Sequence, residues 1–264
     1  MKVKDSFIGS VRVLGDRRKI KRGRVTIDET DHDLIIPTPG YDPDESPFDE
    51  FDHLWPMQDE SLPIEDVNGN LDLTATTGND PTLREDGIYD DHSIWFDATD
   101  HLENRDVSFD TTEPFSMGIW LNHEYGGDYI AGMTLQHTET TSEALGIASS
   151  GGNDGLNEPF PKILSVANTP GHGVTAYHFN TWNFYVVRYD PGEHLAEMFF
   201  NGEFDYDIVP DDDPDWVALL DEIEFGFREP AGSDYPYTGY MAWAWLTSGL
   251  VEEETIRQLY RKIV

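Results

Sequence analysis

The 264-residue sequence predicts an all-β fold, an antiparallel sandwich with a short C-terminal helix, and three observations support this prediction. From about residue 48 to residue 247, short apolar or alternating runs are separated by turn signals, as expected for many short strands. Asp190-Pro191-Gly192-Glu193 and Asn201-Gly202 are hairpin-turn sequences that flank one such run. Helical periodicity occurs only at the C-terminal end.

Seven runs are the clearest candidates for strands, because each is apolar or alternating and is bounded by turn residues. They are Ser93–Asp97, Phe115–Asn122, Tyr129–Gln136, Trp182–Tyr189, Leu195–Phe200, Glu222–Phe227 and Tyr240–Leu246. Between the third and fourth runs, Thr138–Gly173 is rich in Gly, Ser, Thr and Asn. This composition predicts a long variable loop over one face of the sandwich.

The predicted helix follows the last strand. Ser248 is expected to cap it, and Glu252–Glu254 would lie in its first turn, where acidic groups suit the helix dipole. Ile256, Leu259, Tyr260 and Ile263 recur at helical spacing, so they are expected to form one apolar face.

Charge divides the chain into two parts of opposite sign. Residues 1–27 contain nine Lys or Arg and two Asp, whereas residues 28–264 contain 8 basic and 50 acidic residues. The net charges are therefore +7 and −42. An excess of Asp and Glu with few lysines is typical of proteins from extreme halophiles, because molar salt screens the self-repulsion. Most single carboxylates are then expected to be solvated surface groups.

Other compositional features restrict the class of protein. The chain has no cysteine, which excludes disulfides and thiolate metal sites. No stretch approaches the length of a transmembrane span, and Met1–Ser10 lacks the apolar region of a signal peptide. We therefore expect a protein that is not inserted in a membrane and does not use that secretion route.

The N-terminal part is expected to be an attachment segment. Residues 1–36 form a basic arm, with a strand or hairpin around a Gly15-Asp16 turn, and residues 37–48 form an acidic, proline-rich linker. The arm's anchoring residues are expected to be Arg12, Arg17, Arg18, Lys19, Lys21, Arg22 and Arg24. Because the arm lacks interleaved aromatics and the body is anionic, an acidic protein surface is a better partner than nucleic acid.

Residues 49–264 carry a series of motifs that resembles one known family. His53–Met57 followed by Glu65–Asn70 is similar to the opening of a LamG-like jelly roll of the concanavalin A-like lectin/glucanase class. Further motifs of that family are matched in order by Ser93–Asp97, Phe115–Leu121, Thr181–Val187, Met198–Gly202, Thr238–Trp245 and Leu250–Tyr260. The resemblance implies that the motif aromatics are core residues, namely Trp95, Phe96, Phe115, Trp120, Trp182, Phe184 and Phe199.

The resemblance also implies candidate sites. Some relatives bind calcium, and Asp66, Asn68 and Asn70 would supply oxygen ligands on one loop, although the same sequence also makes a good turn without metal. The family's late aspartate is Ala242 or Ala244 here, so one expected ligand is missing.

Glucanases of the class carry carboxylates at alternating strand positions. Glu222 and Glu224 would share a strand face, but the central aspartate of that pattern is absent. Sugar binding would instead need exposed aromatic rings in loops. Tyr125, Tyr129, Tyr235 and Tyr237 are the candidates.

These features lead to one functional hypothesis. The protein would be a non-enzymatic virion surface protein of a halophilic virus, made in the host cytoplasm. Residues 1–48 would dock on acidic capsid or tail proteins, and a homo-oligomeric jelly roll would bind host surface glycans or surface-layer glycoprotein. The alternatives are a glycoside hydrolase, and a cellular adhesion or structural module without ligand.

Overall fold

The structure, a computed structural model, divides the chain into two units, Met1–Gly40 and Tyr41–Val264, which are treated separately. The residues that it describes are 23–27, 30–34, 50–75, 80–84, 88, 93–107, 109–124, 130–137, 144–150, 160–165, 173, 175, 179–209, 220–226 and 237–263.

The first unit contains a β-hairpin. Strands β1 (Gly23–Ile27) and β2 (Thr30–Leu34) pair antiparallel, with Ile27 opposite Thr30. A hairpin therefore exists in this unit, but it lies beyond the predicted Gly15-Asp16 turn, which falls outside the described residues. Of the predicted anchoring residues, Arg24 lies in β1 and the other six lie outside the described part of the chain.

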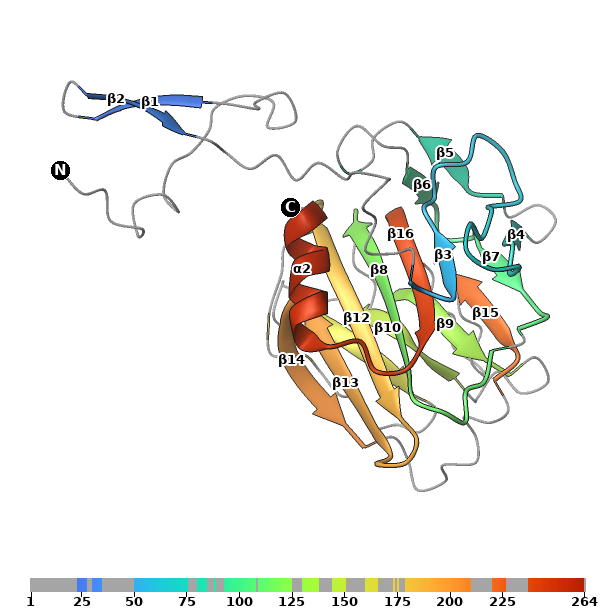
Figure 1. The fold of residues 1–264 in the computed structure, drawn as a ribbon. Helices are drawn as coiled ribbons and strands as arrows, with labels where there is room; N and C mark the ends of the chain where they lie inside the picture. Colours follow the sequence, from blue (N-terminus) through green and yellow to red (C-terminus); the bar gives the residue numbers. More distant parts are fainter. Residues whose placement is uncertain are drawn as a thin grey trace. The chain divides into compact units, whose positions relative to one another are not determined.

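The second unit is a sandwich of two antiparallel sheets that pack face to face (Figure 1). The eight-stranded sheet runs β14 (Glu203–Ile208), β13 (Leu195–Phe200), β12 (Trp182–Asp190), β8 (Phe115–His123), β16 (Gly239–Ser248), β6 (Ser93–Phe96) and β5 (Thr82–Arg84), with β3 (His53–Trp55) paired to β16. The six-stranded sheet runs β11 (Phe160–Ser165), β10 (Ala144–Ser150), β9 (Ile130–Gln136), β15 (Glu222–Phe225), β7 (Leu102–Asn104) and β4 (Thr74–Ala75). The predicted all-β sandwich is confirmed.

All seven predicted strands are present within two residues of their expected ends. The segment predicted as one long loop, Thr138–Gly173, was interpreted incorrectly, because it contains β10 and β11 at the edge of the six-stranded sheet. Its glycines and serines were taken as loop signals. Ile147 and Ile163, however, face each other across the two strands and are buried in the core.

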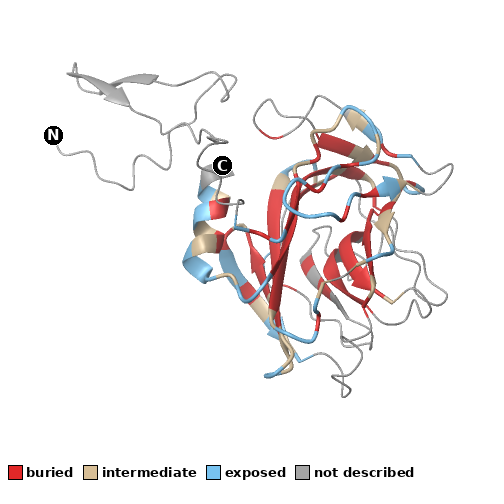
Figure 2. Cartoon of the chain, turned by 45° about the vertical axis from the view of Figure 1, so that its right-hand side comes forward, coloured by how far each residue is buried: buried red, intermediate tan, exposed pale blue. Residues whose placement is uncertain are grey.

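The main core lies between the two sheets, where the inward-facing residues of nearly every strand meet. Alternation along the strands explains this arrangement, since successive side chains point to opposite faces. In β15, for example, Ile223 and Phe225 enter the core while Glu222 and Glu224 point to the outer face. Figure 2 shows the resulting buried strands at the centre of the molecule.

A second core forms between the outer face of the eight-stranded sheet and helix α2 (Glu253–Ile263). Ile256 and Leu259 are fully buried there, and Tyr260 is half-buried, as the predicted apolar face requires. The predicted cap is wrong, because Ser248 ends β16 and its backbone N–H donates to the Asp52 carboxylate. The helix therefore begins five residues later. No helix in the described residues has the length and apolarity needed to cross a bilayer.

The two predicted hairpin turns are confirmed. Asp190 Oδ1 accepts the backbone N–H groups of Gly192 and Glu193 at 2.9 and 3.2 Å between β12 and β13. Asn201 and Gly202 both have positive φ, 52° and 86°, between β13 and β14. A two-residue turn of this kind matches the twist of the paired strands, and Asn-Gly is its favoured sequence.

Candidate functional site

A row of aromatic and amide side chains crosses the outer face of the eight-stranded sheet. Its residues occupy the same register position on five neighbouring strands, β5, β6, β16, β8 and β12; in that order they are Thr82, Trp95, Tyr240, Asn122 and Trp182. Their chain neighbours Ile94, Met241 and Leu121 enter the main core, so the row itself points outward. We call these five residues the aromatic row.

The aromatic row combines ring faces with hydrogen-bonding groups. Trp95, Tyr240, Asn122 and Trp182 are half-buried, and Thr82 is exposed. The ring centroids of Trp182 and Tyr240 lie 6.4 Å apart, with 52° between the ring planes. The amide of Asn122 lies between these two rings in the row, and its Oδ1 is buried, with no hydrogen-bond partner among the described residues. With strands about 4.8 Å apart, the row from Trp95 to Trp182 is roughly 14 Å long.

Helix α2 covers the outward-facing residues that lie two positions along the same strands from the aromatic row. The helix therefore bounds the row on one side. Trp120 lies two residues before Asn122 and stacks between Phe184 and Tyr260, with ring centroids 5.0 and 5.7 Å away. Figure 1 shows the helix lying along the strands that carry these rings. On the outer face of the eight-stranded sheet, the apolar core under the helix and the half-buried aromatic row are therefore only two residues apart along a strand.

The sequence interpretation placed Trp95 and Trp182 in the core with the other motif aromatics. The structure confirms burial for Phe96, Phe115, Trp120, Phe184 and Phe199. Trp95 and Trp182 are only half-buried and face outward. The alternation of their strands carries this signal, since Ile94 and Phe96 flank Trp95 on the core side.

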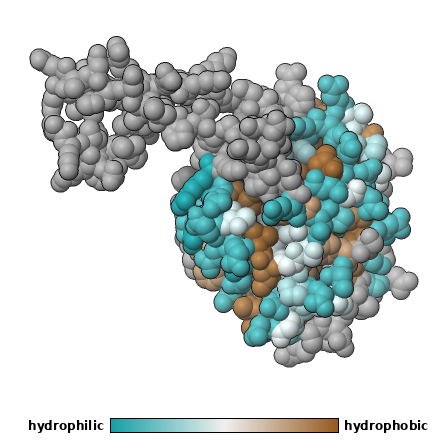
Figure 3. All heavy atoms as spheres, viewed as in Figure 1, coloured by the Kyte–Doolittle hydropathy of each residue, from teal (hydrophilic) through white to brown (hydrophobic). Residues whose placement is uncertain are grey.

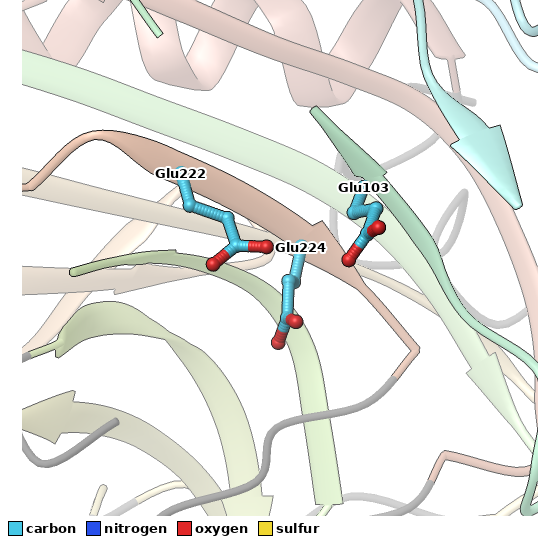
Figure 4. Close-up of side chains that lie close together, drawn as sticks. All are labelled: Glu103, Glu222 and Glu224. Atoms are coloured by element: carbon cyan, nitrogen blue, oxygen red, sulfur yellow. The ribbon is translucent and has the colours of Figure 1, made fainter. Parts of the chain in front are cut away.

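A second polar site lies on the outer face of the six-stranded sheet. Glu222 and Glu224 on β15 and Glu103 on β7 bring carboxylate oxygens within 4.8 Å of one another. Figure 4 shows the three side chains converging from the two strands. Glu224 pairs with Glu103 across the strands, and Glu222 and Glu224 are only 3% and 6% exposed. The predicted sharing of one strand face by Glu222 and Glu224 is observed.

Two neutral side chains on β9 complete this acidic cluster. Gln136 lies opposite Glu222 and donates from Nε2 to Glu222 Oε2 at 3.3 Å, and Thr134 lies opposite Glu224. Both are buried, at 3% and 0% exposure. Within the described residues, Gln136 Oε1, Thr134 Oγ1 and Glu224 Oε2 have no hydrogen-bond partner.

Burial and charge repulsion control protonation in the acidic cluster. Desolvation, followed by repulsion from Glu222 and Glu103, raises the pKa of Glu224 to about 8. Arg105 lies at the rim, with Nε 2.9 Å from Glu222 Oε1 and Nη2 2.9 Å from Glu103 Oε2. Its side chain is 62% exposed, so its charge is strongly screened by solvent.

The loop predicted to bind calcium is held by protein contacts. Asp66 is buried; its Oδ1 accepts the N–H groups of Leu54 and Gly69, and its Oδ2 accepts the N–H of Leu71 and contacts His53 Nδ1. Burial alone would raise the pKa of Asp66, but hydrogen bonds from His53, Leu71 and Leu54 lower it below its ordinary value.

The two asparagines of the loop have surroundings that differ from those of Asp66. Asn68 donates from Nδ2 to the Phe51 carbonyl, and Asn70 is exposed. The Asp66 oxygens already have protein donors, so this arrangement does not fit a calcium ligand set. The sequence motif is explained by the turn that it builds.

The tyrosines predicted to bind sugar divide into two groups. Tyr237 is fully buried, and its hydroxyl donates to the Tyr240 carbonyl at 2.8 Å, so its ring presents no face to a ligand. Tyr125, Tyr129 and Tyr235 lie outside the described residues.

Comparison with known proteins gives structural similarity alone. No family model and no curated protein sequence match the chain. Domain 4 of AbnA, a GH43 extracellular arabinanase from Geobacillus stearothermophilus solved with arabinotriose, is similar with a TM-score of 0.60 and 14% identity, over 80% of this chain and 98% of that chain.

Two other kinds of solved structure share the fold. The botulinum neurotoxin type G receptor binding domain gives a TM-score of 0.54 at 11% identity, over 80% of this chain and 51% of that chain. Trypanosoma rangeli sialidase, solved with the inhibitor DANA, gives a TM-score of 0.57 at 10% identity, over 79% of this chain and 32% of that chain. The chain thus spans about half of the toxin domain and a third of the sialidase. Together these structures show that the β-sandwich fold of this chain is shared with known proteins.

Proposed function

We propose that the sandwich is a carbohydrate-binding domain and that the aromatic row is its binding surface. The observation that carries the proposal is the alignment of Trp95, Tyr240 and Trp182 across adjacent strands, with Asn122 between two of them. Sugar rings have apolar C–H faces and hydroxyl edges. Tryptophan and tyrosine can therefore stack on the faces and hydrogen-bond to the edges.

The preferred ligand is a neutral glycan. Residues 28–264 contain 8 basic and 50 acidic residues, so few side chains could pair with the negative groups of an anionic sugar. Figure 3 shows hydrophilic residues over most of the face that carries helix α2, with smaller apolar areas between them. A row of roughly 14 Å suits contacts with more than one sugar ring, and repeated copies would raise weak affinity through avidity.

The test is retention on immobilised neutral glycans in molar salt. Trp182→Ala and Tyr240→Ala should each weaken binding about tenfold or more, since each removes a stacking surface. Phe204→Ala is the matched control, because Phe204 is an aromatic side chain 47% exposed on β14, outside the row. Asn122→Ala tests the contribution of the amide without removing a ring. Glycan binding that survives both Trp182→Ala and Tyr240→Ala would reject the aromatic row as the site.

A glycoside hydrolase is the alternative that the acidic cluster keeps open. Hydrolysis needs two carboxyl groups on either side of an accessible glycosidic bond. Burial of Glu222 and Glu224 to 3% and 6% exposure favours a binding protein without that activity. A screen for sugar release from oligosaccharides, with Glu224→Gln for comparison, tests this. Release by the unmodified protein that is lost in the variant would establish an enzyme.

We also propose how the domain is displayed. The charge contrast between residues 1–27 and the acidic body supports an attachment role for the first unit, Met1–Gly40, on an acidic protein lattice. A virion surface in a halophilic host, with several copies of the chain displayed outward, is the setting that we propose. This part of the proposal rests on composition.

Deletion of residues 1–40 tests whether the first unit attaches the domain to its partner lattice. The shortened chain should retain its thermal unfolding midpoint and glycan binding, because the sandwich has its own core within Tyr41–Val264. It should no longer bind an acidic partner lattice or co-purify with particles. Incorporation of the shortened chain into particles at the normal level would show that the basic unit is not the attachment.

A further inference from the structure

We propose that the acidic cluster of Glu103, Glu222 and Glu224, with Gln136 and Thr134, is a calcium-binding site. It lies on the outer face of the six-stranded sheet, whereas the aromatic row lies on the outer face of the other sheet. The proposal is independent of glycan binding and of the Asp66 loop.

The spacing of the carboxylates suits one cation of calcium's size. Calcium binds oxygen at about 2.4 Å, so two ligands on opposite sides of the ion are about 4.8 Å apart. One carboxylate oxygen from each of Glu103, Glu222 and Glu224 lies within 4.8 Å of the other two. A single position between them is therefore within reach of all three.

The neighbouring neutral oxygens are the second observation that points to a cation. Gln136 and Thr134 are 3% and 0% exposed, and their side chains face the cluster from β9. Gln136 Oε1 and Thr134 Oγ1 have no hydrogen-bond partner among the described residues. An unsatisfied buried oxygen is costly, and a cation that accepts amide and hydroxyl oxygens beside carboxylates would satisfy both.

The charge balance also favours a divalent ion. Among the described residues, the charged groups near Glu224 are Glu222 on its own strand, Glu103 on β7 and the exposed Arg105 just after β7. His101 Nε2 lies 3.8 Å from Glu103 Oε2. A single screened guanidinium cannot neutralise three carboxylates in a buried site. A divalent cation between the carboxylates would supply the missing positive charge.

Calorimetry on the full chain in about 2 M KCl, after removal of divalent ions with a chelator, tests the site. High salt is required because 52 acidic residues would otherwise attract calcium non-specifically. We expect one saturable calcium per chain and a binding constant at least tenfold weaker for magnesium. Magnesium is disfavoured because it demands a tight octahedral shell and loses its waters reluctantly.

Variants assign the binding to these residues. Glu222→Gln and Glu224→Gln should each weaken calcium binding at least tenfold, while circular dichroism reports an intact fold. A triple variant of exposed residues, Glu60→Gln, Glu113→Gln and Glu193→Gln, removes more charge elsewhere and should bind calcium normally.

Three results would overturn the proposal. They are the absence of saturable calcium binding in molar salt, an equal loss of calcium affinity in the triple variant of exposed residues, and magnesium binding as tight as calcium binding. Glycan retention by Glu224→Gln distinguishes the two sites. A variant that loses calcium and keeps glycan binding supports independent sites.

Discussion

His53 Nδ1 lies 2.6 Å from Asp66 Oδ2, and this contact joins β3 to the loop that follows it. The Asp66 carboxylate also accepts three backbone N–H groups, so one buried side chain organises the turn. Trp55 is held beside it, because its indole N–H donates to the Leu71 carbonyl at 2.9 Å. The first motif of the domain is therefore a hydrogen-bonded corner that fixes β3 against the loop that follows it.

Asp66→Asn should destabilise the sandwich by about 2 to 4 kcal/mol, because the amide would direct a donor at N–H groups and leave buried donors unsatisfied. Denaturant unfolding in molar salt measures the change. Glu65→Gln, an exposed substitution next in the chain, should have little effect and serves as the control. Equal stability of the two variants would show that the corner contributes nothing to the fold.

Much of the fold could be predicted because its signals are local. The Asn201-Gly202 turn and the apolar runs such as Leu195–Phe200 specify strands through alternation and turn chemistry, and both are observed. Thr138–Gly173 was misinterpreted because edge strands of small and polar residues have the same composition as a loop. Only their pairing with β9 buries Ile147 and so reveals strand β10.

The candidate sites were less predictable because they depend on pairing between distant segments. Trp95, Tyr240 and Trp182 become neighbours only through the register of four strands that are far apart in the sequence. Likewise, alternation predicted that Glu222 and Glu224 share a face. Nothing local predicted that β7 would place Glu103 beside them.

Protonation of Glu224 should make stability fall as pH rises from about 5 to 8. The folded chain holds this proton up to a pKa of about 8, whereas the unfolded chain releases it near the ordinary glutamate pKa of 4.5. The folded state therefore binds more protons within this window, and its stability decreases by up to about 1.4 kcal/mol per pH unit. Calcium-free denaturant unfolding at pH 5, 6.5 and 8 measures the slope.

Glu224→Gln removes the titrating group and keeps the side chain's shape. The variant should show a shallower dependence on pH in that window and should be more stable than the unmodified protein at pH 8. Glu113→Gln, which is exposed, should leave the dependence unchanged. A variant with the unmodified slope would mean that Glu224 is already ionised at neutral pH.

His123 should act in the opposite direction at lower pH. It is fully buried beside Tyr185 and Tyr237, and desolvation lowers its pKa to about 3. The unfolded chain takes up this proton near pH 6.5, so stability should fall as pH decreases from 6.5 toward 3. An NMR titration should find the His123 ring neutral at pH 5. His123→Phe should reduce the loss of stability between pH 6.5 and 4.5, and observation of a protonated ring at pH 5 would contradict the prediction.

Arg105 should oppose calcium binding, because its guanidinium contacts the Glu222 and Glu103 carboxylates that would bind the ion. Arg105→Gln removes a competing positive charge, and because the side chain is 62% exposed the gain should be modest, roughly 3- to 10-fold in calcium affinity. Calorimetry in molar salt measures it, with Arg261→Gln, an exposed arginine on α2, as the control. If Arg105 instead served only to hold the cluster together, the same variant would bind calcium more weakly. An increase in calcium affinity would therefore show that Arg105 competes with the ion. A decrease would show that Arg105 holds the carboxylates in place.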